Sequence, residues 1–224
     1  MSETYLSNKE ALAEAHVLEL INNLARSTED AIRETLSLLE EFAKGKLEIV
    51  RVKYSRIRTF KNRSEELKSK TLEYLVRTGP SMLFKDIYVS IAYNLERIAQ
   101  LMNGISHRLL LLSLKGLTPS VDVAKRLVSF GEKFIEEYEG LKRTLIMMNY
   151  NPKKVIEGAR EVFRLEDEID DMYRSNEVEL YEKHSSNLIL LMLLKEVYDI
   201  IEESSDLVKD SAENLAYLAL HKIP

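Results

Sequence analysis

The chain has 224 residues, of which 45% are hydrophobic and 31% are charged, enough to fill a sizeable core and to cover long helices with ion pairs. Seven glycines and four prolines are very few for this length and are typical of long helices rather than of strands and turns. The net charge of −5, with no clustered basic face evident, argues against nucleic acid as the main partner. Without cysteine, the chain has neither disulfides nor thiolate metal sites and suits a reducing compartment such as the cytosol.

The sequence predicts neither export through a signal peptide nor a membrane-spanning helix. Residues 1–10 are polar and lack the basic and then apolar pattern of a signal peptide. The longest apolar runs, residues 109–112 and 188–194, are far shorter than the ~20 residues that a membrane-spanning helix requires. A membrane role would therefore be peripheral, at the inner face.

Rare helix breakers divide the chain into six predicted helices. Breaks are expected at Gly45, at Gly79-Pro80, between Gly116 and Pro119, and from Asn149 to Pro152. The predicted helices cover residues 8–44, 46–78, 84–114, 119–148 and 152–183, and a sixth follows the 184–187 segment and reaches residue 219. Thr118 with Pro119 is predicted to cap the fourth helix, and Asn151 with Pro152 the fifth.

Apolar residues recur three or four positions apart along the third predicted helix. This face is formed by Ile87, Ile91, Leu95, Ile98, Met102, Ile105, Leu109 and Leu112. The spacing marks one face of a helix, and long helices with short connections must lie antiparallel to bury such faces. The sequence therefore predicts an all-α, elongated six-helix bundle.

The two halves of the chain resemble each other, because the third and sixth predicted helices occupy equivalent places. Aligning Glu96 with Glu202 gives a period of 106 residues. We expect two three-helix repeats, residues 1–116 and 117–224, within one continuous domain. The alternative is that unrelated amphipathic helices imitate a repeat.

Acidic pairs on the fifth and sixth predicted helices form the candidate site. Glu166 and Asp170 are four residues apart and share a helix face, and Glu166 falls within an apolar stripe. Glu202 and Asp206 repeat this spacing. A buried carboxylate needs an arginine, a hydrogen-bond network or a metal ion to offset its desolvation. Two antiparallel helices can bring the four carboxylates together as an all-oxygen site for a hard or borderline divalent metal.

Other readings of these acids are a solvated face with i,i+4 ion pairs, or a catalytic site. The histidines stand apart and lack the Glu-x-x-His spacing of ferritin-type di-iron sites; they are His16, His107, His184 and His221. The sequence has no glycine-rich phosphate loop, nucleophile elbow or supported Ser/His/Asp constellation. We therefore predict that the protein is not an enzyme. The alternatives are a structural or oligomerisation bundle without metal and a metal-dependent enzyme acting on phosphorylated substrates.

Two segments resemble PhoU-like proteins. Residues 166–170, followed by residues 194–215, resemble the second PhoU repeat, particularly in the Pit-accessory branch. Residues 94–99, Asn-Leu-Glu-Arg-Ile-Ala, resemble the Asp-Leu-Glu-Arg-Ile-Gly segment of the first repeat. The six-helix, two-repeat plan of that family covers nearly the whole chain.

The resemblance implies a cytoplasmic regulator of inorganic phosphate uptake that contacts a phosphate transporter or sensor protein. It also implies binding of a metal such as iron, zinc, manganese or magnesium through Glu/Asp-x-x-x-Asp clusters. Transferred to this sequence, the ligands would be Glu166, Asp170, Glu202 and Asp206, with Asp199 and Asp210 as additions. Exposed apolar stripes would also allow a homo-oligomer.

The first repeat departs from the family pattern. Glu96 is followed by Gln100 where the family has an aspartate. The second predicted helix offers Ser64 with Lys68, or Lys61 with Glu65, depending on the alignment. A protonated lysine cannot act as an ordinary metal ligand. We therefore predict one metal site, in the C-terminal half, or none.

Overall fold

The computed structural model describes residues 2–78 and 82–223, and within them it contains six helices and no strand. The helices are α1 (Ser2–Ala43), α2 (Leu47–Thr78), α3 (Lys85–Leu114), α4 (Val121–Met147), α5 (Pro152–His184) and α6 (Leu188–Leu220). The predicted all-α class is confirmed, and the helix ends lie within about two residues of the predicted ones, except that α1 already begins at Ser2. The predicted break at Gly79-Pro80 lies outside the described residues.

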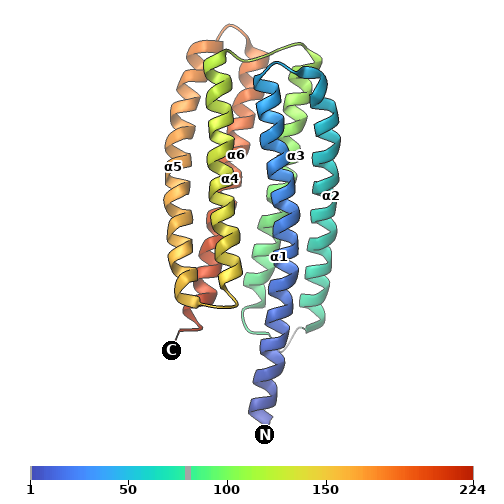
Figure 1. Cartoon of the computed structure of the whole chain (residues 1–224), viewed down its shortest axis with the longest axis vertical. Coiled ribbons are helices and arrows are strands. Elements are labelled where there is room, and N and C mark those ends of the chain that lie inside the picture. Colours follow the sequence, from blue (N-terminus) through green and yellow to red (C-terminus); the bar gives the residue numbers. More distant parts are fainter. Residues whose placement is uncertain (1, 79–81, 224) are drawn as a thin grey trace.

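The helices form two groups of three that lie side by side. Helices α1, α2 and α3 pack against one another, as do α4, α5 and α6. The groups meet where α1 packs on α4 and α3 packs on α6. Figure 1 shows α1 and α4 on the near side, α3 and α6 behind them, and α2 and α5 along opposite edges. Each edge helix therefore keeps one long side free of other helices.

A continuous apolar core holds α4 against both α1 and α6. The phenol of Tyr138, which is fully buried, donates a hydrogen bond to the carbonyl oxygen of Ala25 at 2.8 Å. On the other side of α4, the ring of Phe130 packs on the ring of Tyr198, with centroids 5.8 Å apart. These contacts fix the rotation of α4, and thereby the direction in which its remaining core-facing residues point.

Side-chain caps explain where the later helices begin. Asn151 accepts hydrogen bonds from the backbone amides of Lys153 and Lys154, with Pro152 in the first turn, as predicted. The predicted cap of the fourth helix is wrong. Ser120, in extended backbone, accepts from the amide of Val123, so that α4 starts two residues after the proline.

Candidate functional site

The facing sides of α5 and α6 bring together acidic residues that the sequence placed in one site. Glu166 is 5% exposed, which confirms its predicted core position. Asp170, one turn further along α5, is half-buried. Burial raises the pKa of both Glu202 and Asp206, and the charge of Asp170 raises both further. These three carboxylates are therefore close enough to repel one another.

Glu166 and Asp170 each have a basic partner in the structure. The ammonium of Lys209, on α6, donates to Glu166 Oε2 at 2.9 Å. The guanidinium of Arg174 donates to Asp170 Oδ2 at 2.8 Å. By contrast, neither Glu202 nor Asp206 has an ion pair within the described part of the chain. Uncompensated negative charge therefore lies on the α6 side of the site.

Glu137 on α4 also faces this cluster, and sequence reasoning missed it. Its side chain is fully buried, and its Oε2 atom accepts a hydrogen bond from the Ser205 hydroxyl at 2.8 Å. Its Oε1 atom has no hydrogen-bond partner among the described residues. Burial raises the pKa of Glu137 well above its ordinary value; the Ser205 hydrogen bond opposes this rise, and the charges of Glu166 and Asp206 add to it.

A sequence signal for Glu137 exists in retrospect. Phe130, Phe134, Tyr138 and Leu141 are spaced as a helical core stripe, and position 137 lies within that stripe. A glutamate at such a position must be buried, as Glu166 was predicted to be. We name the group of Glu137, Glu166, Asp170, Glu202 and Asp206, together with Lys209, the acidic cluster.

The two additional candidate ligands lie beside the acidic cluster, because the charge of Asp199 raises the pKa of Glu202 and that of Asp210 raises the pKa of Asp206. Asp199 accepts a hydrogen bond from the Tyr173 hydroxyl at 2.8 Å and pairs with Lys195. Asp210 is exposed and has no ion pair among the described residues. The structure thus gives Asp199 its own partners and leaves Asp210 in solvent.

The corresponding position in the first half is filled by a lysine. Glu96 is 3% exposed, and its Oε2 atom accepts from the Lys68 ammonium at 2.8 Å while Oε1 accepts from the Gln100 amide at 2.5 Å. The Ser64 hydroxyl donates a hydrogen bond to the Ser27 hydroxyl at 3.0 Å. With both carboxylate oxygens of Glu96 occupied, these residues do not fit a metal site.

The acidic side chains of the cluster are chemically suited to a cation, but they do not form a ready-made coordination site. Their donors are carboxylate oxygens, which suit hard divalent ions, and the buried Oε1 atom of Glu137 has no partner. Among the described residues, however, no three acidic or imidazole side chains are arranged as ligands of one ion. Lys209 already offsets part of the negative charge.

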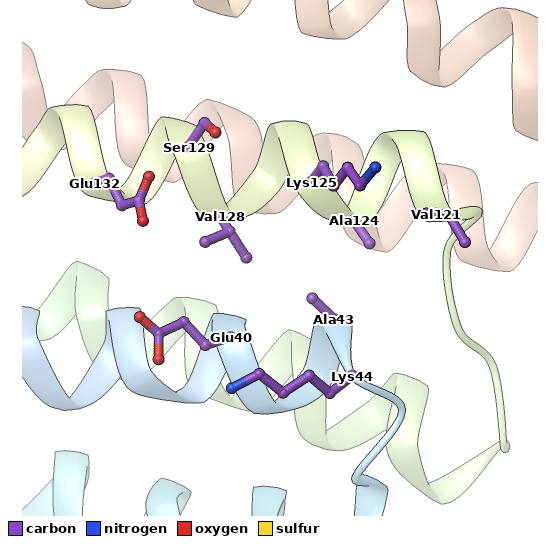
Figure 2. Close-up of a pocket in the computed structure, with 9 residues that line it drawn as sticks. All are labelled: Glu40, Ala43, Lys44, Val121, Ala124, Lys125, Val128, Ser129 and Glu132. Carbon is purple, nitrogen blue, oxygen red and sulfur yellow. The ribbon is translucent and has the colours of Figure 1, made fainter.

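An open groove of about 490 Å³ between the end of α1 and the start of α4 is separate from the acidic cluster. Figure 2 shows Ala43 and Val128 directed into the gap between the two helices, with Glu40 and Glu132 toward one end. None of the acidic-cluster residues lines this groove. It therefore adds no ligand to the candidate site.

No family model and no curated protein sequence matches this chain. Solved structures do. A protein from Shewanella oneidensis MR-1, assigned as a PhoU-like phosphate regulatory protein, superposes with a TM-score of 0.79 at 14% identity, covering 92% of this chain and 100% of that one. PhoU from Pseudomonas aeruginosa gives a TM-score of 0.71 at 15% identity, with 94% and 99% covered.

The phosphate transport system regulatory protein PhoU from Streptococcus pneumoniae gives a TM-score of 0.59 at 18% identity, over 95% of this chain and 96% of that one. The class of structure is thus an all-α bundle of two three-helix groups. More particularly, the chain has the PhoU-like fold, which confirms the resemblance at the level of structure. In the part of the chain that is described, no helix is long and apolar enough to cross a bilayer.

Proposed function

We propose that this protein is a regulator or accessory protein of inorganic phosphate uptake that acts by contact with a phosphate transporter or sensor protein. The observation that carries the proposal is the end-to-end match of the six-helix bundle to three structures described as phosphate regulatory or PhoU proteins. The role is non-enzymatic and belongs to the cytoplasmic side of the membrane. A structural bundle with no regulatory partner is the alternative.

The test is phosphate uptake by cells that lack this protein. Uptake of radiolabelled phosphate is measured at low and high external phosphate, with and without the gene restored on a plasmid. We expect the dependence of uptake on external phosphate to change without the gene and to return with it. Identical uptake in all strains would support the structural alternative.

We further propose that Asp170, Glu202 and Asp206 of the acidic cluster change side-chain conformation to bind one divalent cation, because among the described residues no three acidic side chains are already arranged around one ion. Support comes from the raised pKa values of Glu202 and Asp206, because a bound cation would relieve the repulsion that contributes to them. Lys209 is then a tethered competitor, since its ammonium already neutralises the neighbouring Glu166. Iron, zinc, manganese and magnesium all accept carboxylate ligands.

Elemental analysis after loading with each metal tests this site. Wild type is expected to keep one ion, Glu202→Gln/Asp206→Asn to lose it, and Lys209→Met to hold it more tightly. Glu48→Gln/Glu66→Gln is the matched control, because it removes the same charge from α2, outside the acidic cluster. Wild type without metal, or equal metal in the first variant, would contradict the site.

A further inference from the structure

The first half of α2 is strongly basic in a chain of net charge −5. Residues 49–63 contain six lysines and arginines and no acidic residue. The net charge hides this concentration, so the expectation that the chain has no clustered basic face is wrong. The basic residues differ, however, in whether the fold already uses them.

Four arginines on this segment are open to solvent. Arg51 and Arg58 are exposed and have no ion pair among the described residues. The side chains of Arg56 and Arg63 are 66% and 62% exposed and form ion pairs with Glu34 and Asp30 on α1, at 3.5 and 4.0 Å. We name these four residues the basic face.

The remaining two basic residues of the segment are structural. Lys53 is 12% exposed and forms an ion pair with Glu34 on α1. Its ammonium also donates a hydrogen bond to the Ser37 hydroxyl on the same helix. Lys61 is 25% exposed and pairs with Glu65 at 2.7 Å. These lysines are more buried than the arginines, so the arginines are the solvent-exposed basic side chains of the segment.

The arginines follow the helix axis. Arg51 and Arg58, like Arg56 and Arg63, are seven residues and thus about 10.5 Å apart, at 1.5 Å of rise per residue. Each of these two pairs forms a row along the helix. The exposed residues between the rows carry no charge; they are Val52, Ser55, Thr59 and Asn62. Figure 1 shows α2 as a straight helix along one edge of the bundle, so no other helix lies on its outer side.

The opposite edge of the bundle is net acidic, because α5 and α6 each carry more acidic than basic residues, although Lys153, Lys154 and Arg160 on α5 are also exposed. Asp167 on α5 and Asp206 and Asp210 on α6 are exposed and lack ion pairs among the described residues. With 8–10 Å between packed helices, α2 and α5 are about 25 Å apart across α1 and α4. This separation is about three times the Debye length of roughly 8 Å at physiological salt. The acidic edge therefore does little to weaken an anion's attraction to α2.

We propose that the basic face binds the anionic headgroups of a lipid bilayer and lays the bundle lengthwise on the membrane, with the α5–α6 edge directed away. A planar anionic surface engages all four arginines at once, and arginine pairs well with phosphate groups. The inference rests on the proposed function in one respect: the bilayer is the surface in which a phosphate transporter would lie. The binding itself needs no transporter.

Co-sedimentation with pure lipid vesicles tests the proposal. Wild type is expected to bind vesicles containing about a third phosphatidylglycerol, to ignore phosphatidylcholine vesicles, and to dissociate at high salt. Arg51→Gln/Arg58→Gln is expected to weaken binding about 30-fold, from about 1 kcal/mol per basic residue at an anionic surface and 1.4 kcal/mol per tenfold change. The control Lys153→Gln/Lys154→Gln removes the same charge from exposed residues of α5 and is expected to change binding less than about threefold.

Each other outcome overturns the proposal. Absence of wild-type binding, or equal losses in the two variants, would show that the basic face does not bind lipid. Retention of the wild type by DNA, without vesicle binding, would assign the face to a nucleic acid. The vesicles contain no protein, so their result is independent of the phosphate-uptake measurement, and either proposal can fail without the other.

Discussion

Glu137 is a carboxyl group in the middle of an apolar helix face, and its protonation couples stability to pH. Its pKa is near 4.5 when the chain is unfolded and well above that in the folded protein, so the folded state binds the proton more tightly. The resulting stabilisation is complete below pH 4.5 and is lost as the pH rises toward the folded pKa. As the pH rises above 4.5, wild type should therefore lose this part of its stability. A variant with a neutral side chain at position 137 should not.

The variant Glu137→Gln keeps the shape and the acceptor for Ser205 without the charge. In chelator-treated protein, we expect its advantage over wild type in urea unfolding to grow between pH 5 and pH 8. The growth should reach up to about 1.4 kcal/mol per pH unit until the folded pKa is passed. A difference that stays constant over this range would mean that Glu137 is charged in the folded protein.

Lys68 and Glu96 form a nearly buried pair whose partners depend on each other. Lys68→Met would leave a carboxylate that is 3% exposed with Gln100 as its remaining partner, and we expect it to cost about 3 kcal/mol in the free energy of unfolding. The double variant Lys68→Met/Glu96→Gln should recover most of that loss. A single-variant cost below about 1 kcal/mol would show that water solvates Glu96 despite its burial.

Sequence reasoning found some of these residues and missed others for one physical reason. The burial of Glu166 followed from its place in an apolar stripe, which is a property of one helix. The roles of Lys68 and Lys209 depend on which helix lies opposite, and the sequence does not state that. Lys68 was recognised only as a poor metal ligand, not as the partner of Glu96.

At the scale of elements, the close packing of α4 against α5 depends on Gly158. A Cβ atom built at this position would lie 2.3 Å from Thr144 Oγ1, far inside van der Waals contact. We therefore expect Gly158→Ala to lower the free energy of unfolding by about 1–3 kcal/mol in urea titrations.

Gly104 provides the control for this prediction. A Cβ atom there would meet its nearest neighbours at 3.4 and 3.5 Å, so Gly104→Ala should be neutral or stabilising through helix propensity. The double variant Thr144→Ala/Gly158→Ala should regain part of the lost stability. Equal effects of the two glycine substitutions would place the cause in helix propensity and not in the α4–α5 contact.

Helix boundaries were predictable because glycine and proline are rare in this chain, and because capping residues close in sequence set where helices begin. Asn151 with Pro152 caps α5 through contacts within three residues, which sequence reasoning captures. The start of α4 was misjudged because Thr118 and Ser120 are both good caps, and the choice depends on how the connection from α3 reaches α4.

At the scale of the whole molecule, the all-α bundle followed from composition and periodicity, but its distribution of charge did not. A net charge of −5 is compatible with any arrangement of basic and acidic residues. Only the helix packing shows that the four exposed arginines of the basic face lie along one edge and that α5 and α6, which carry more acidic than basic residues, lie along the opposite edge. The same arrangement leaves both edges available to partners.

The most direct test of the proposed function is affinity purification of the tagged protein, after crosslinking, from the membranes of the cells that produce it. If the protein regulates phosphate uptake by contact, a phosphate transporter subunit or phosphate sensor should be enriched over a tag-only control and recovered as a crosslinked pair. Recovery of well-folded protein without any component of phosphate transport, from cells grown at both low and high phosphate, would contradict the account.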